Sequence, residues 1–291
     1  MDDTYNYSMW VELYNAGTTS MNISNYYFSD DITNLRKWRQ PASRTVNAGG
    51  YIIIWFERNG LSYLHCDFKL LPEGGILYMS NSSGVLVDSV VYPEQFRNVS
   101  YGRKTDGADE WVFFEDFSPG GSNNDKKSAS VACEKPVFTL EGGFYSTTQT
   151  IGFKTPPQGD TIYYTRNGSE PTRSNTRYEE GTTISLTTTS VIRARTFSAN
   201  KLPSEISTAT YFVRDRNFDL PVVSIVTEQK NISDNVIGIY VAGTNGIPGN
   251  GTDARVNWNQ DWDRPANVEI FDKTGKICMS QELDICIAGG W

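Results

Sequence analysis

The sequence predicts an all-β protein with two consecutive β-sandwiches followed by an incomplete β-rich segment. Short runs that are apolar, or that alternate apolar and polar residues, recur along the chain with turn residues between them. Aromatic residues make up 13% of the 291 residues, and such side chains favour strands. Gly, Asn, Ser and Thr are abundant, which suits turns. A chain of this length is expected to hold two or three domains.

The net charge of −8 argues against nucleic acid as a partner, because an acidic surface repels phosphate groups. No apolar run reaches the length of about eighteen residues that a transmembrane helix needs, so we expect no membrane span in this chain. The first residues are acidic and polar, and they therefore lack the pattern of a signal peptide.

Polar stretches divide the chain into three segments, with expected domains at 1–124, 134–213 and 218–291. Residues 118–128 are rich in Gly, Ser and Asn and are predicted to form a linker. A charged stretch at 214–217 precedes the third segment.

Periodicity marks the strands of the first segment. Residues 10–14 alternate apolar and polar side chains, which predicts a half-buried strand. Residues 51–56 are apolar throughout, which predicts a central strand buried on both faces. Residues 76–80 and 85–92 flank the turn sequence NSSG and are predicted to form a hairpin.

Five motifs of the first segment resemble a lamin-tail domain. They are WVELYN at 10–15, AGGY at 48–51, GGILY at 74–78, DSV at 88–90 and SPG at 118–120. Their order and spacing agree with that family over roughly residues 8–124, and the resemblance implies an immunoglobulin-like sandwich. The family usually begins with a strand that holds an Asn-Glu pair, which the first nine residues lack.

The second segment contains a strand with two unlike faces. Ile192, Ala194 and Thr196 alternate with Arg193 and Arg195, which predicts one buried face and one solvent face.

The motifs GGFYS, TIGF, IYYTRNGSEPT and VIRARTF of the second segment resemble the chitobiase/β-hexosaminidase C-terminal-type domain over about residues 134–213. This resemblance implies a small fibronectin-III-like sandwich of a kind appended to many secreted bacterial proteins.

The third segment contains five expected strands, at 221–226, 237–241, 267–271, 276–280 and 284–288. They resemble the opening strands of the CotH (spore-coat protein H) kinase-like family, which form part of its nucleotide-binding lobe. The resemblance implies that Gly289 and Gly290 are a remnant of a nucleotide loop. The Ser-Arg pair and the lysine strand of that family do not follow within this chain, so we expect no catalysis here.

An incomplete sheet exposes an unpaired edge. We therefore expect the third segment either to pack against the second sandwich or to self-associate with another copy of the chain. In the first case, Arg193 and Arg195 are expected to meet acidic residues of the third segment, for which the candidates are Asp261, Asp263 and Glu269.

The four cysteines form no CxxC pair and have no accompanying histidine cluster, so no metal site is expected. Cys278 and Cys286 flank a predicted turn near 281–282, where a disulfide bridge would join them across two strands. Two buried free thiols are the favoured alternative.

The only histidine, His65, precedes Cys66 on a predicted strand. Neighbours on a strand point to opposite faces, so these two residues cannot form a catalytic pair, and a sheet-surface histidine is favoured. The Asp261-Trp262-Asp263 run is predicted to be a solvated loop rather than a metal site.

Tyr163, Tyr164 and Tyr178 are candidates for a carbohydrate-binding platform, with packing in the core or at a sheet edge as the favoured alternative. Tyr163 and Tyr164 must face opposite sides of their strand.

These observations predict non-catalytic binding or spacer modules of a secreted or cell-surface bacterial protein that present a downstream CotH-like domain. The expected partner is a protein or glycan at the cell surface, and no cofactor is expected. The alternative is a fragment of a CotH-like atypical kinase whose ATP-binding and catalytic residues lie beyond Trp291.

Overall fold

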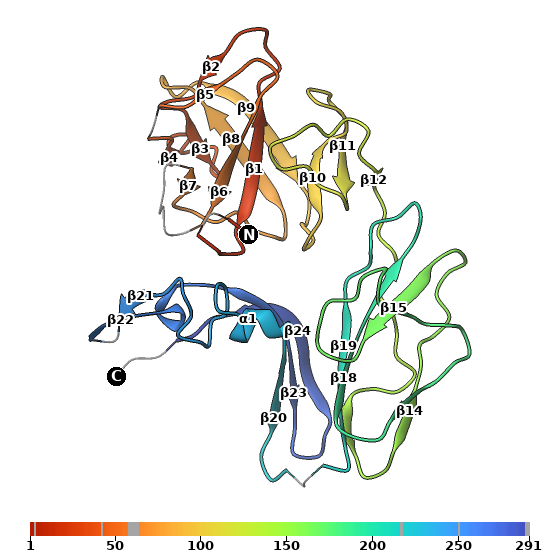
Figure 1. Cartoon of the computed structure of the whole chain (residues 1–291). Helices are drawn as coiled ribbons and strands as arrows, with labels where there is room; N and C mark the ends of the chain where they lie inside the picture. Colours follow the sequence, from red (N-terminus) through yellow and green to blue (C-terminus); the bar gives the residue numbers. More distant parts are fainter. Residues whose placement is uncertain (3, 42, 58–63, 216–217, 250, 289–291) are drawn as a thin grey trace. The chain divides into compact units, whose positions relative to one another are not determined.

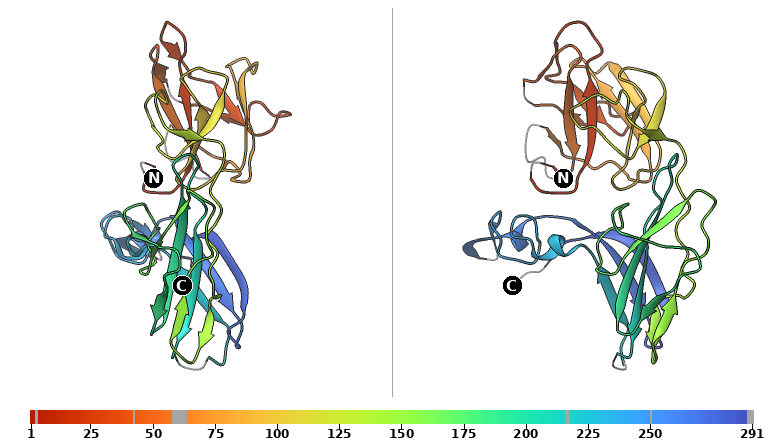
Figure 2. Two further views of the ribbon diagram at one scale, coloured as in Figure 1. Left: turned by 90° about the vertical axis from the view of Figure 1, so that its right-hand side faces the viewer. Right: turned by 45° about the vertical axis from the view of Figure 1, so that its right-hand side comes forward.

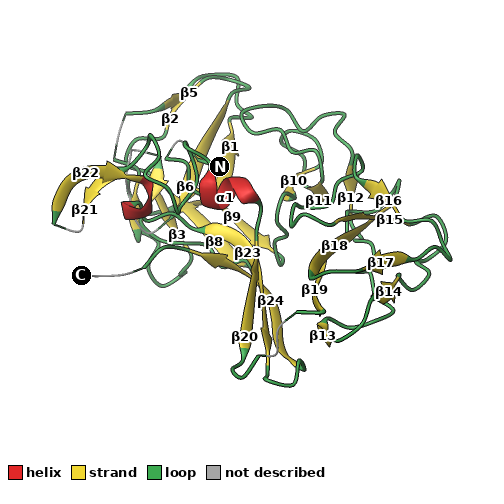
Figure 3. Cartoon of the chain, turned by 60° about the horizontal axis from the view of Figure 1, so that its bottom comes forward, coloured by secondary structure: helices red, strands yellow, loops and turns green. Residues whose placement is uncertain are grey.

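The computed structural model describes residues 1–291 except 3, 42, 58–63, 216–217, 250 and 289–291. Strands account for 40% and helix for 3% of the chain, so the predicted all-β class is confirmed (Figure 1, Figure 3). The chain divides into two compact units, Ser8–Ser130 with Asp2 and Val131–Trp291 with Met1 and Asp3–Tyr7. None of the helices in the described ranges is long and apolar enough to cross a membrane.

Two sheets form the sandwich of the first unit. The first has the order β4 (Trp38–Arg39), β3 (Tyr27–Ser29), β8 (Gly75–Ser80), β9 (Leu86–Tyr92), and the second has the order β1 (Met9–Tyr14), β6 (Tyr51–Phe56), β7 (His65–Cys66). Smaller sheets are β2 (Met21–Asn22) with β5 (Thr45–Val46), and β10 (Ser100–Arg103) with β11 (Trp111–Phe114) and β12 (Ser128–Ala129). The core lies between the two main sheets and includes Phe28, Trp38, Ile54, Phe56, Cys66 and Leu77.

The strands of the first unit agree with the sequence in their pairing and differ from it in burial. The hairpin is confirmed, because β8 and β9 pair antiparallel. The central position of β6, between β1 and β7, is also confirmed. Burial of β6 on both faces is wrong, since Ile54 and Phe56 are buried whereas Trp55 between them is only half-buried. The predicted linker ends in a strand, because Ser128 of β12 pairs with Phe114 of β11.

A five-stranded sheet forms the main layer of the second sandwich. Its order is β13 (Gly143–Tyr145), β19 (Ser207–Val213), β18 (Ser190–Phe197), β15 (Thr161–Thr165), β16 (Thr176–Arg177), and β14 (Gln149–Ile151) pairs with β17 (Ile184–Leu186) beside it. The core includes Ile151, Phe153, Ile162, Leu186, Ile192 and Tyr211. One pair in each sandwich, β6 with β7 and β13 with β19, runs parallel, so the sandwiches are not wholly antiparallel.

The C-terminal segment forms a three-stranded sheet. Its order is β20 (Val222–Val226), β23 (Arg264–Phe271), β24 (Ile277–Ile285), and the segment also holds α1 (Gln229–Ser233), the pair β21 (Ile247–Gly249) and β22 (Thr252–Val256), and a 3₁₀ turn at Asn257–Asn259. Two strand predictions are wrong. Residues 237–241 form turns and bends, in which the Ile239 N–H donates to the carbonyl of Asn231 in the middle of α1. The predicted strands at 276–280 and 284–288 are not separate, because residues 277–285 form the single strand β24, which pairs with β23 through Gln281 and Glu282; residues 286–288 lie beyond its end.

This C-terminal sheet packs against the second sandwich, which is one of the two expected outcomes; self-association stays a prediction. In both views of Figure 2 the blue strands of the segment run alongside the green to cyan strands of the sandwich. A phenylalanine cluster lies between the C-terminal sheet and the second sandwich, and it consists of Phe144, Phe212, Phe218 and Phe271. Phe212 lies 5.4 Å from Phe271 and 5.2 Å from Phe144, measured between ring centroids. Phe271 is fully buried.

The predicted solvent face of β18 is not exposed, because the C-terminal sheet packs on it. Arg193 is only 5% exposed. Its Nη1 donates to the Gly168 carbonyl at 3.1 Å, and its Nη2 lies 3.6 Å from Glu282 Oε1 on β24. The strand alternates as predicted, but the C-terminal sheet covers its polar face. Glu282 is thus an acidic residue beside Arg193, and it was not among the expected partners.

The loop before β23 is also covered. Trp262 is buried, and its Nε1 donates to the Thr4 carbonyl at 2.9 Å. The Asp263 N–H donates to Asn6 Oδ1 at 3.1 Å. The prediction of a solvated loop is wrong at Trp262, because residues from the start of the chain dock on it.

A carboxyl group lies buried where β19 meets β23. Glu269 is 0% exposed, and its Oε2 accepts from Thr210 Oγ1 at 2.5 Å. Its Oε1 has no hydrogen-bond partner among the described residues. Burial raises the pKa of Glu269 to about 7, against the lowering effect of the hydrogen bonds from Thr210. The contact therefore favours the protonated carboxyl.

We predict that Glu269 makes the second unit less stable as pH rises. Between its unfolded pKa of 4.5 and its folded pKa of about 7, the folded state binds the proton more tightly. This contribution is fully present below pH 4.5 and is lost by about pH 7, with an upper limit of about 3 kcal/mol from about 1.4 kcal/mol per pKa unit. Urea unfolding of the second unit across this pH range measures the slope.

The variant Glu269→Gln should flatten that slope. Glu205→Gln is the matched control, because Glu205 is an exposed residue of the same unit that pairs with Lys135. An unchanged slope in Glu269→Gln would show that other groups set the pH dependence.

Candidate functional site

The three candidate tyrosines do not form one platform. Tyr164 and Tyr178 both face the core and both contact Phe153, with ring centroids 6.2 Å and 4.9 Å away. Tyr163 lies on the opposite face, as predicted from the strand, with its ring 5.6 Å from that of Phe197. All three rings are half-buried, and their role in carbohydrate binding stays a prediction.

Tyr178 lines an open hollow of about 400 Å³ on the second sandwich. Its O–H donates to the Thr182 carbonyl at 2.8 Å, which fixes the ring at the wall. The other side chains around the hollow are mostly hydroxyl-bearing or charged, and they include Thr139, Thr150, Thr155, Thr183, Lys154 and Glu180. The hollow therefore combines an aromatic wall with a polar rim.

The proposed remnant of a nucleotide loop, Gly289 and Gly290, lies outside the described residues.

The cysteines are free, and Cys278 and Cys286 are exposed. Cys278 lies on β24 and Cys286 directly follows it, so the eight residue-to-residue steps from one to the other span about 26 Å of extended chain. A disulfide needs Cα atoms no more than about 7 Å apart, which rules out the bridge. The alternative of two buried thiols is wrong as well, since the buried cysteines are Cys66 and Cys133.

His65 lies at one end of the β1-β6-β7 sheet, where strand register brings polar residues together. Met9 pairs with Phe56 in the antiparallel β1 and β6, so Ser8 lies opposite Glu57. Phe56 pairs with Cys66 in the parallel β6 and β7, and the Glu57 N–H donates to the Cys66 carbonyl at 3.2 Å. The ends of three neighbouring strands therefore supply Ser8, Glu57 and His65.

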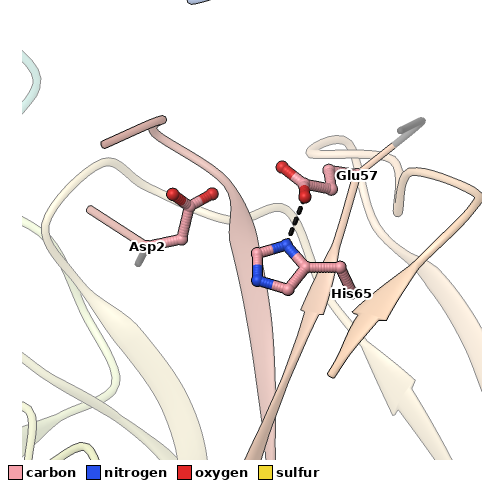
Figure 4. A group of neighbouring side chains, drawn as sticks. All are labelled: Asp2, Glu57 and His65. Atoms are coloured by element: carbon pink, nitrogen blue, oxygen red, sulfur yellow. Dashed lines mark hydrogen bonds and ion pairs between the residues drawn. The ribbon is translucent and has the colours of Figure 1, made fainter. Parts of the chain in front are cut away.

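Asp2 completes a buried cluster with these residues (Figure 4). The exposed fractions are 1% for His65, 2% for Glu57 and 7% for Asp2. His65 Nδ1 contacts Glu57 Oε1. Ser8 Oγ lies 2.6 Å from Asp2 Oδ2 and 3.0 Å from Glu57 Oε2. One ligand atom from each of Asp2, Glu57 and His65 lies within 4.8 Å of the others.

The structure corrects the interpretation of His65 as a surface residue. It does face away from Cys66, which joins the core, so the predicted alternation is right. The position is nevertheless buried. Asp2, Ser8 and Glu57 were not singled out from the sequence. Pairing the strand at 10–14 with that at 51–56 is the signal that would have placed Ser8 beside Glu57.

Comparison with protein families identifies two immunoglobulin-like modules of non-catalytic types. The Lamin Tail Domain family model matches residues 1–94, and the Chitobiase/beta-hexosaminidase C-terminal domain model matches residues 140–208. Both resemblances expected from the sequence are thus supported, whereas the CotH-like resemblance of the C-terminal segment receives no support. A search of curated proteins finds no match.

We predict that two thiols react in the native protein and two do not. Cys278 and Cys286 should react rapidly with a thiol reagent at neutral pH, because they are exposed. Cys66 should react only after unfolding, since burial raises the pKa of its thiol to about 12, and Cys133 is buried too. Mass spectrometry of labelled peptides measures this pattern, and protection of Cys278 or Cys286 would contradict the extended β24.

Proposed function

We propose that the chain is a pair of non-catalytic binding or spacer modules of an exported bacterial protein, and that the second module binds a glycan. The hollow beside Tyr178 carries this proposal. Carbohydrate recognition needs an aromatic surface for the apolar face of a sugar ring and polar groups for its hydroxyls. The wall of Tyr178 and the rim of threonines supply both.

The rim is arranged for hydrogen bonding with an outside ligand. Thr155 Oγ1 donates to Glu180 Oε1 at 2.6 Å, which leaves the second oxygen of this exposed carboxylate directed to solvent or ligand. Thr183 is exposed beside it. In such a setting hydroxyl groups donate to and accept from sugar hydroxyls, and carboxylate oxygens accept from them.

We base the proposal of export on the types of the two modules. Both modules are of types that resemble parts of exported bacterial proteins, and the net charge of −8 suits a soluble surface. We place the protein outside the cytoplasm, either secreted or at the cell surface. Detection of the protein in the cytosolic fraction of its native cell alone would contradict this.

A CotH-like continuation of residues 218–291 is proposed as the neighbour that these modules present. The face of the C-terminal sheet that points away from the second sandwich exposes Val223 and Ile225 at 55% and 57%. Apolar side chains of this kind suit contact with a further domain. In the alternative, the parent protein is an atypical kinase, and its nucleotide site lies outside these modules.

We predict that the hollow binds a neutral oligosaccharide, for which N-acetylglucosamine oligomers are the first probe. Thr183→Val, which removes a rim hydroxyl without touching the core, should weaken binding several-fold, and Tyr178→Leu should weaken it at least tenfold, as expected for losing about 1.4 kcal/mol. Isothermal titration of the full chain measures both constants.

Thr188→Val is the matched control, since Thr188 is exposed in the same module but lies outside the hollow. Equal affinity in Thr183→Val and Thr188→Val would contradict the glycan site. ATP with magnesium tests the kinase alternative, and we expect no change in Tm, whereas a ligand at 100 times its Kd would add about 2.7 kcal/mol.

A further inference from the structure

The buried cluster of Asp2, Glu57 and His65 combines groups that rarely occur together inside a protein. Two carboxylates in one buried site repel each other unless a positive charge lies between them or one of them takes up a proton. The imidazole provides a neutral nitrogen ligand or, when protonated, one positive charge. All three residues are more than nine-tenths buried, so solvent screens their charges weakly.

Ser8 cannot satisfy both carboxylates at once. Its Oγ lies within hydrogen-bond distance of Asp2 Oδ2 and of Glu57 Oε2, but a hydroxyl carries one proton. When it donates to one carboxylate, its contact with the other is between two oxygens that share no hydrogen. A cation bound by the carboxylates removes this conflict.

We propose that Asp2, Glu57 and His65 bind a divalent transition-metal ion, and that Zn²⁺ fits the site best. Zinc takes nitrogen from histidine and oxygen from carboxylates, and where the protein supplies three ligands a water takes the fourth position. Imidazole suits zinc and its neighbours, whereas magnesium and calcium prefer oxygen ligands alone. The site needs no cysteine, which is why the absence of CxxC motifs does not exclude it.

The geometry needs only small side-chain movements to close on the ion. Ligands about 2.1 Å from a tetrahedral zinc lie about 3.4 Å from one another. The ligand atoms of the cluster already lie within 4.8 Å of each other. Zinc would enter between His65 Nδ1 and Glu57 Oε1, which are in contact, and Asp2 would reach it from the start of the chain. Ser8 then donates to a carboxylate ligand and orients it.

The ion would stabilise the fold by joining residues that lie far apart in the sequence. Glu57 follows β6 and His65 begins β7, while Asp2 lies six residues before Ser8 at the start of β1. A single ion would therefore join Asp2 to the ends of two neighbouring strands of the first unit. Because the unfolded chain does not hold these residues together, metal binding should stabilise the folded state.

Zinc titration of the full chain tests the site. The exposed thiols also bind zinc, so the parent for this experiment carries Cys278→Ser and Cys286→Ser. After treatment with a chelator, the protein should take up one Zn²⁺ per chain, counted by elemental analysis after gel filtration, and its Tm should rise. Magnesium and calcium should leave the Tm unchanged.

Asp2→Asn should weaken zinc binding at least tenfold without lowering the Tm of the metal-free protein, because it removes one of the two carboxylate charges from the buried cluster. His65→Asn and Glu57→Gln should abolish stoichiometric uptake. Asp67→Asn is the matched control, since Asp67 is exposed and follows the same strand. Loss of stoichiometric uptake in the parent, or uptake that persists in His65→Asn, would overturn the proposal.

Cobalt provides a readout that does not depend on variant folding. Co²⁺ bound to the parent should show visible absorption bands of a low-coordinate site, and added Zn²⁺ should remove them. A spectrum of hydrated cobalt alone would contradict ligation by the cluster.

Discussion

The contact between the outer face of β18 and β19 and the C-terminal sheet is the interaction on which the second unit depends. Phe271 on β23 is fully buried against Phe212 on β19, and truncating such a side chain costs about 3–5 kcal/mol. Glu269 and Thr210 meet on the same face. The turn after β23 lets the C-terminal sheet come close to the sandwich. Gly275 in this turn has a φ of +88°, and a Cβ there would lie 2.7 Å from the Phe144 ring. The covering sheet thus makes the polar face of the sandwich part of a core.

The sequence predicts each strand better than it predicts what covers the strand. Alternation identified Ile192 and Ala194 as buried, because a period of two separates the faces of one strand. It could not show that Arg193 is buried, since the residue beside it, Glu282, lies far along the chain. The turn expected near Gln281 failed for a related reason: pairing with Val268 and Asn267 holds β24 extended through that point.

The same distinction applies to the His65 cluster. Part of the cluster follows from the pairing of two predicted strands, since the pairing of Met9 with Phe56 brings Ser8 and Glu57 together. Asp2 lies outside any periodic element, so no pattern could place it. Burial changes what these residues can do, because a carboxylate inside a protein needs a counter-charge or a proton, whereas in water it needs neither. A lone histidine in the sequence became a metal-ligand candidate only when its neighbours were known.

Native-state hydrogen exchange of Phe271→Ala tests most directly whether the second sandwich and the C-terminal sheet form one cooperative unit. The account predicts that amides of β18, β19 and β23 lose protection together, by a common free energy of about 3 kcal/mol. Val223→Ala, on the exposed face of β20, should leave all three strands protected. Loss of protection in β23 alone, with β18 and β19 unchanged, would contradict the account and show that the sandwich is stable without its cover.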